Sequence, residues 1–172
     1  MSEALKTRIR HVADFPKAGI LFYDVTTLLR DPEGFQLAID GIAAPFSGGG
    51  IDLVVGIESR GFILGSAVAD RIHAGFVPVR KLGKLPSATV RATYALEYGT
   101  DSLEMHRDAV TPGQRVLVVD DLLATGGTAS AAVRLVKELE GIVVGVAVLI
   151  ELAALNGRKQ LEGENLHTVL TY

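Results

Sequence analysis

The chain has 172 residues and a formal net charge of −3. This length suits one domain with a sizeable core, since such a domain buries roughly 70% of the surface that its unfolded chain exposes. The mildly acidic charge predicts neither a nucleic-acid partner nor a membrane partner. No cysteine is present, which excludes disulfides, thiolate nucleophiles and thiolate metal sites. A charged N-terminal stretch without a long apolar run predicts a soluble, cytoplasmic protein.

The N-terminal part predicts a small unit followed by a helix. Residues 14–27 form an irregular stretch with a proline, a glycine and a short apolar patch, and we assign a hood to about residues 1–30. Asp31 and Pro32 are a good N-cap and first-turn pair for a helix that runs to about Ala44. Residues 47–50, Ser-Gly-Gly-Gly, are most simply a flexible connector.

Short apolar runs then alternate with helical segments. The runs lack period-two alternation, which is typical of strands covered on both faces, and the segments between them show apolar spacing near 3.6. This order predicts one α/β domain, with a core over about residues 31–152 and a mainly parallel twisted sheet of about five strands that binds ligands at its carboxyl edge. The predicted strands are Ile51–Ile57, Gly75–Val79, Arg115–Val119 and Ile142–Ile150, and the later helices are Phe62–Ile72 and Ala129–Leu139.

Residues 81–107 interrupt this alternation. The segment is long, polar and punctuated by glycine and proline, and loops of this length in compact domains tend to be functional or disordered. Tyr94–Tyr98 and Ser102–His106 can form two strands around residues 99–101. We therefore predict a lid hairpin here.

The most informative stretch is residues 116–128, Val-Leu-Val-Val-Asp-Asp-Leu-Leu-Ala-Thr-Gly-Gly-Thr. The apolar strand carries Asp120 and Asp121 to the sheet edge, where they can accept hydrogen bonds from vicinal hydroxyls or hold a hydrated cation. The turn that follows, residues 124–128, can direct backbone N–H groups and hydroxyls at a phosphate, helped by the positive end of the next helix. This order predicts a pocket for a phosphorylated sugar.

Neither the NTPase pattern G-x-x-x-x-G-K-[ST] nor the dinucleotide pattern G-x-G-x-x-G after a strand occurs in the chain. The strand, acid pair and glycine turn instead resemble the type I phosphoribosyltransferases. The resemblance implies that the acid pair binds the ribose and the turn binds the 5-phosphate of phosphoribosyl pyrophosphate (PRPP). The implied ribose and 5-phosphate residues are Asp120, Asp121, Ala124, Thr125, Gly126, Gly127 and Thr128.

Three further stretches, residues 15–26, 58–62 and 79–86 with 96–99, resemble the adenine phosphoribosyltransferases within that family. The resemblance implies transfer of the phosphoribosyl group from PRPP to adenine, giving AMP and pyrophosphate. It also implies Mg²⁺ as a cofactor held mainly through PRPP, with no direct protein ligand, and a homodimer in which basic residues near Arg80 can serve the neighbouring subunit. Two departures stand out, Ala18 in place of a usual proline and Tyr23 in place of a frequent arginine.

The leaving pyrophosphate must be neutralised, and positive groups near its oxygens stabilise the charge that grows in the transition state. A basic run beside a strand end is otherwise a solvated edge, but Arg80 and Lys81 lie at the expected ligand edge of the sheet. The family resemblance also implies a non-proline cis peptide between Glu58 and Ser59. The expected pyrophosphate residues are Ser59, Arg60, Arg80, Lys81 and Lys84.

By resemblance, Glu97 in the lid takes or relays the proton that adenine loses at N9. Read without the resemblance, Glu97 is equally an exposed hairpin charge, and the 20–22 patch is more simply a packed surface turn. The expected adenine residues are Leu21, Phe22, Tyr23 and Leu152. Two rivals remain at this point: a transferase for another base, such as hypoxanthine or uracil, and a non-catalytic regulator that senses PRPP.

Overall fold

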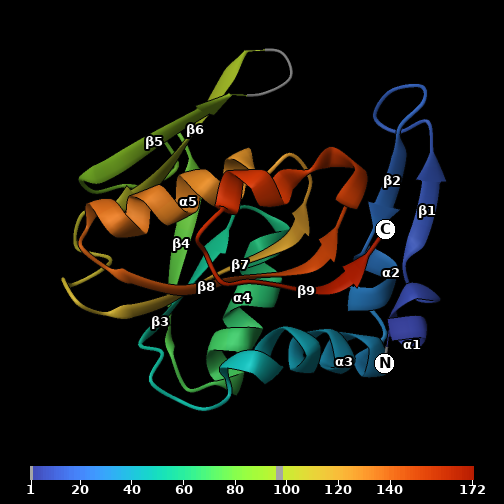
Figure 1. Cartoon of the computed structure of the whole chain (residues 1–172), viewed down its shortest axis with the longest axis horizontal. Coiled ribbons are helices and arrows are strands. Elements are labelled where there is room, and N and C mark those ends of the chain that lie inside the picture. Colours follow the sequence, from blue (N-terminus) through green and yellow to red (C-terminus); the bar gives the residue numbers. More distant parts are fainter. Residues whose placement is uncertain (1, 96–98) are drawn as a thin grey trace.

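The computed structural model of the chain describes residues 2–95 and 99–172, and a seven-stranded sheet forms its centre. Five neighbouring strands are parallel, and two antiparallel strands extend the sheet at one edge. Figure 1 shows helices on both faces of this sheet. The expected mainly parallel α/β domain is confirmed. In spatial order the strands are β5 (Thr89–Ala95), β6 (Thr100–His106), β4 (Gly75–Lys81), β3 (Leu53–Ile57), β7 (Arg115–Leu123), β8 (Ile142–Glu151) and β9 (Leu166–Thr171).

The helix ends follow from local sequence. Asp31 caps the third helix by accepting a hydrogen bond from the Gly34 N–H at 3.3 Å, with Pro32 in the first turn, as expected. The next two long helices each begin two residues before the apolar spacing indicates, because their first residues add nothing to the apolar pattern. The helices are α1 (Ser2–Lys6), α2 (Thr26–Leu29), α3 (Pro32–Ala43), α4 (Arg60–Arg71) and α5 (Gly127–Glu138), with short 3-10 helices η1 (Ala44–Phe46), η2 (Ala153–Leu155) and η3 (Gly157–Leu161).

Alternate residues of β7 enter two hydrophobic cores, one on each face of the sheet. Val116 and Val118 pack on the face covered by α5, whereas Leu117 and Val119 pack on the face covered by α3 and α4. All four side chains are fully buried. A strand covered on both faces is apolar throughout, which explains why its sequence lacks alternation.

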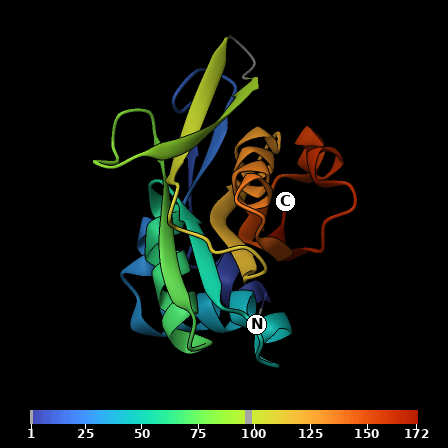
Figure 2. The same ribbon diagram turned by 90° about the vertical axis from the view of Figure 1, so that its left-hand side faces the viewer.

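The β5–β6 hairpin belongs to the main sheet. β6 pairs antiparallel with the end of β4, where Arg80 faces Glu104 and Lys81 faces Leu103. β5 starts well before the strand predicted at Tyr94–Tyr98, and the last three residues of that predicted strand lie outside the described residues. Figure 2 shows the hairpin projecting from the body of the molecule while its base remains in the sheet.

The N-terminal hood consists of α1, β1 (Arg10–Ala13), β2 (Leu21–Asp24) and α2. β1 and β2 form a separate antiparallel pair, and Leu5, Val25 and Leu28 anchor the hood in the core on the α3 and α4 face. In Figure 1 the hood (blue) and the hairpin (yellow-green) rise on two sides of the edge at which the parallel strands end. A ligand at that edge therefore lies between them.

β9 adds a fifth parallel strand that the apolar pattern does not indicate. Its residues are mostly half-buried, so they form no continuous apolar run, and the strand pairs with β8 from Leu166 to Thr171. The strand leads to Tyr172, whose ring centroid lies 4.3 Å from that of Tyr23 in the hood. The C-terminal segment thus holds the hood against the sheet.

Candidate active site

The acid pair lies at the carboxyl end of β7. This strand continues past its predicted end at Val119, so Asp120 and Asp121 are held by the sheet and pair alongside β8. Their exposures of 8% and 7% are low for carboxylates. The Asp121 N–H donates to Asp120 Oδ1 at 2.9 Å, which fixes the first carboxylate relative to the strand. The pair is therefore a rigid feature of the sheet edge.

The turn after β7 requires glycine at one position for two reasons. Gly126 has a φ of +86°, which other residues rarely adopt, and a Cβ there would lie 2.3 Å from the carbonyl oxygen of Gly157. A Cβ on Gly157 would in turn lie 2.3 Å from the carbonyl oxygen of Ala124. The turn therefore rests on the start of η3 with no room between the two backbones.

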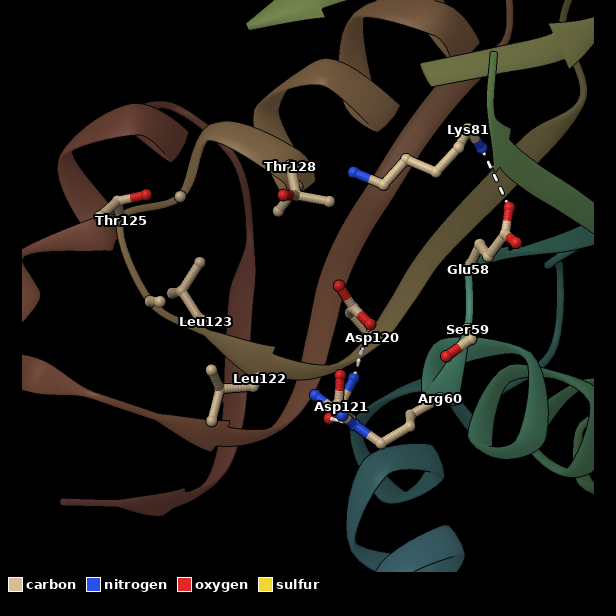
Figure 3. A pocket seen from close by; sticks show the side chains of 13 residues that line it. Glu58, Ser59, Arg60, Lys81, Asp120, Asp121, Leu122, Leu123, Thr125 and Thr128 are labelled. Atoms are coloured by element: carbon tan, nitrogen blue, oxygen red, sulfur yellow. Dashed lines mark hydrogen bonds and ion pairs between the residues drawn. The ribbon is translucent and has the colours of Figure 1, made fainter. Parts of the chain in front are cut away.

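A cavity of about 300 Å³ joins the acid pair, the turn and the ends of β3 and β4. In Figure 3 the Asp120 carboxylate and the Lys81 ammonium point into it from different strands, and the turn closes one side. The cavity brings together most of the residues that we predicted for the ribose, the 5-phosphate and the pyrophosphate. Its lining comprises Glu58, Ser59, Arg60, Lys81, Asp120, Asp121, Leu122, Leu123, Ala124, Thr125, Gly126, Thr128 and Ala129.

The first carboxylate of the pair is electrostatically unusual. Burial raises the pKa of Asp120 well above its ordinary value, and the neighbouring Asp121 carboxylate raises it further, whereas Arg60 opposes the shift. The fold disfavours the ionised form of Asp120. A cation or a hydroxyl donor that enters the cavity would therefore stabilise this form. Such perturbed acids in a cleft are typical of functional sites.

Arg60 links the acid pair to the hood. Its guanidinium forms an ion pair with the Asp121 carboxylate and lies 5.6 Å from the centroid of the Phe22 ring. Arg60 is the first residue of α4 and follows Ser59 directly. The peptide between Glu58 and Ser59 is cis, as expected.

The remaining basic residues divide into two groups. Arg80 does not line the cavity: its guanidinium donates to both Glu58 carboxylate oxygens, at 3.1 and 3.2 Å, and to the Lys84 carbonyl oxygen at 3.2 Å. The Arg80 hydrogen bond lowers the pKa of Glu58, against the effect of burial. Lys81, by contrast, extends into the cavity, where its Nζ donates to the Tyr94 hydroxyl at 2.9 Å and pairs with Asp101.

The expected adenine residues lie beside this cavity, not in its lining. Leu21 and Phe22 belong to β2, and the Tyr23 ring packs against Tyr172. The Leu152 N–H donates to the Leu123 carbonyl oxygen at 2.9 Å, which places Leu152 next to the lining. Gly127 faces a second cavity beside β5. The expected residue Glu97 lies outside the described residues.

Comparison with known proteins decides the family. The phosphoribosyl transferase domain model matches residues 25–167. The adenine phosphoribosyltransferase of Solibacter usitatus is 59% identical over 98% of this chain and 97% of its own length. The crystal structure of the Rhodothermus marinus adenine phosphoribosyltransferase is 56% identical, with a TM-score of 0.95 over 99% of this chain and 97% of that chain. The chain belongs to the adenine phosphoribosyltransferase family.

A third relative carries ligands. The Saccharomyces cerevisiae adenine phosphoribosyltransferase, solved with D-2,5-dideoxy-2,5-imino-altritol 1,6-bisphosphate and adenine, is 41% identical, with a TM-score of 0.92 over 98% of this chain and 97% of that chain. Membership of this family confirms the expected fold and the expected enzyme class, a transferase of pentosyl groups.

Glu58 and Gly157 contribute to the site without an assignment from the sequence. Glu58 lines the cavity and fixes both Arg80 and the Lys81 backbone N–H, which it accepts at 3.0 Å. An acid directly after a buried strand is the signal that could have identified it. Gly157 supports the turn, but its sequence surroundings carry no signal, because its role depends on a contact with residues 124–126.

The chemistry of the donors bears on metal binding. Within residues 2–95 and 99–172 no three His, Cys, Asp or Glu side chains are grouped as metal ligands. The cavity offers two carboxylates, and Asp121 is already paired with Arg60. Mg²⁺ requires six oxygen ligands, so this donor set suits an ion that arrives with most of its oxygens supplied by a substrate and water.

No helix among the described residues is long and apolar enough to cross a membrane.

Proposed function

We propose that the cavity at the end of β7 binds PRPP and that the chain transfers its 5-phosphoribosyl group to adenine in purine salvage. In this reaction N9 of adenine bonds to C1 of the ribose, the bond from C1 to the pyrophosphate oxygen breaks, and N9 loses its proton. The products are AMP and pyrophosphate. The observation that carries the proposal is the convergence of a buried acid pair, a glycine turn and two cations in one cavity.

The 5-phosphate binds the turn of residues 124–128. Gly126 and Gly127 contribute backbone N–H groups to the turn, and Thr125 and Thr128 add hydroxyl donors. The turn opens into α5, whose N-terminal partial positive charge favours the phosphate. The close contact with Gly157 keeps this arrangement from collapsing before the ligand arrives.

The ribose hydroxyls bind the acid pair. Asp120 points into the cavity and can accept hydrogen bonds from hydroxyl groups at little cost in reorganisation, because the sheet already fixes it. Asp121 becomes available when its ion pair with Arg60 opens. That step releases the Arg60 guanidinium for the pyrophosphate.

The pyrophosphate lies toward Ser59, Arg60 and Lys81, which line the same end of the cavity. Their charges oppose the negative charge that grows on the leaving oxygen. Arg80 and Lys84 lie behind them and shape the strand end, where Glu58 neutralises Arg80. Both can still act on a neighbouring subunit, since neither lines the cavity of its own chain.

Adenine binds between the hood and the ribose site. The candidates are Leu21, Phe22, Tyr23 and Leu152, of which Phe22 stands over Arg60 and Leu152 adjoins the cavity. Main-chain groups of β2 distinguish the amino group of adenine from a carbonyl. Because Tyr23 directs its ring to Tyr172, its contribution at this point is its backbone. Glu97 accepts or relays the N9 proton.

Mg²⁺ would be held mainly through PRPP, and it would supply a Lewis acid that neutralises charge on the pyrophosphate. Asp120 and Asp121 are the residues that would hold its water ligands. We also propose a homodimer, on the basis of the family resemblance. The cytoplasmic location stays a prediction.

The test is a panel of bases. Protein with PRPP and Mg²⁺ should convert adenine to AMP and release one pyrophosphate per nucleotide, while hypoxanthine, guanine and uracil give no product. Product from another base would show that the hood does not select adenine. Tight PRPP binding with no product from any base would identify a sensor and refute the proposed transfer.

A further inference from the structure

We propose that Asp101 and Tyr94 are positioning residues that hold the Lys81 ammonium at the pyrophosphate end of the cavity. This inference rests on the proposed function, since it takes Lys81 as a pyrophosphate ligand. Asp101 and Tyr94 lie on the β5–β6 hairpin, outside the glycine turn and outside the cavity lining. Their polar groups would act on PRPP through Lys81.

The three side chains form a closed set of contacts. Lys81 Nζ pairs with Asp101 Oδ2 and donates to the Tyr94 hydroxyl at 2.9 Å, while that hydroxyl donates to the same Asp101 oxygen at 3.2 Å. The other Asp101 oxygen accepts the Ser102 N–H at 2.8 Å. An ammonium has three donors, so two fixed partners leave one N–H for a ligand in the cavity that Lys81 lines.

The strand register explains how the two partners come together. Tyr94 and Asp101 face each other across the antiparallel β5–β6 pair, and cross-strand neighbours on one face lie close enough to share a ligand. Lys81 ends β4, which pairs with β6 at that position. The sheet therefore places two hydrogen-bond acceptors, Tyr94 and Asp101, around the Lys81 ammonium where the hairpin leaves the sheet.

Tyr94 also touches the phosphate turn. Its side chain is 7% exposed, and a Cβ on Gly127 would lie 3.0 Å from its ring. The residue that binds the Lys81 ammonium thus packs against the turn that receives the 5-phosphate. The position of Lys81 is thereby tied to the other end of the same substrate.

The surroundings of Lys81 favour its charged ammonium form. Burial lowers the pKa of Lys81, but the hydrogen bonds that its ammonium donates to Asp101 and Tyr94 outweigh this effect and leave the pKa raised. The cation therefore stays charged beside the cavity. Holding it in place before PRPP binds also removes the side-chain entropy that a free lysine would lose on binding.

The opposite role is also testable. An acid next to a lysine can compete with an incoming anion, and in that case removal of Asp101 would tighten PRPP binding. The positioning role predicts the reverse, since an unheld lysine must be ordered by the substrate. The sign of the change in PRPP affinity separates the two roles.

The experiment measures the PRPP dissociation constant by calorimetry in a double-mutant cycle of Asp101→Asn and Lys81→Met. Asp101→Asn alone should weaken PRPP binding about tenfold, as expected for a lost charge-assisted contact, and leave the adenine KM unchanged. In the Lys81→Met background the same change should have less than a twofold effect. Tyr94→Phe keeps the buried ring, should weaken binding about threefold, and gives a second reading if Asp101→Asn fails to fold.

Asp70→Asn is the control, because it removes the same charge from the exposed end of α4 and should leave PRPP affinity unchanged. Unchanged or tighter binding by Asp101→Asn, or an equal loss in both backgrounds, would overturn the positioning role. A parent protein that binds PRPP but forms no nucleotide would refute the proposed transfer while the cycle still reports on Asp101. A parent that does not bind PRPP would refute both.

Discussion

Replacement of Gly157 by alanine tests whether the phosphate turn depends on its support from η3. Gly157 belongs to no predicted binding group, and its side of the contact shows no left-handed backbone. A Cβ added there would lie 2.3 Å from the Ala124 carbonyl oxygen, about 1 Å inside the ordinary contact distance that begins at 3.4 Å. The turn or η3 must therefore move by about that amount.

A shift of about 1 Å in a positioning element can cost about 100-fold in rate. We expect kcat/KM for PRPP to fall about 100-fold in Gly157→Ala, the adenine KM to stay unchanged, and the free energy of unfolding to fall by about 1–3 kcal/mol from overpacking. Steady-state kinetics with each substrate varied in turn, together with urea unfolding, measure these quantities. The kinetics are measured well below the melting temperature, so that unfolding of the variant does not lower the measured rate.

Gly48→Ala is the matched control. It makes the same chemical change in the connector before β3, where an added Cβ would have nothing within 4 Å. This variant should match the parent in both kinetics and stability. If Gly157→Ala kept its kcat/KM for PRPP, the contact between the turn and η3 would not be needed for the reaction of PRPP.

Two changes in the acid pair give further predictions. Asp121→Asn should weaken PRPP binding about tenfold by calorimetry, because a charge-assisted acceptor is lost; an unchanged dissociation constant would remove its ribose role. For Asp120 the folded-state pKa is raised, so the folded protein binds more protons and loses stability as pH rises through the interval above the ordinary value of 3.8. Asp120→Asn should therefore be more stable than the parent at pH 8 and equal to it at low pH in urea unfolding, while binding PRPP more weakly; equal stability at both pH values would contradict the assigned shift.

The sequence predicts the part of the site that depends on strand ends. Asp120, Asp121 and the turn are contiguous. Arg60 lies just after β3, which is the parallel neighbour of β7, and Lys81 ends β4, which is the parallel neighbour of β3. Because parallel strands end at one edge, apolar runs followed by polar residues suffice to bring these groups into one cavity. Local pattern and one topological rule explain why these residues converge.

The remaining contacts depend on tertiary register. Tyr94 binds Lys81 only because β5 starts at Thr89 and pairs with β6 in a particular alignment. Buried and exposed residues alternate along this strand, but alternation alone does not set its register with β6. Gly157 meets the turn across thirty residues of intervening chain that no short-range pattern can place. β9 is likewise half-buried and lacks a continuous apolar run.

The close contact between η3 and the glycine turn also affects when the turn can form during synthesis of the protein. The acid pair and the turn leave the ribosome before Gly157 does, so a nascent chain carries the recognisable motif without the backbone on which it rests. Binding of PRPP at this turn, as proposed above, would therefore require that Gly157 has also emerged.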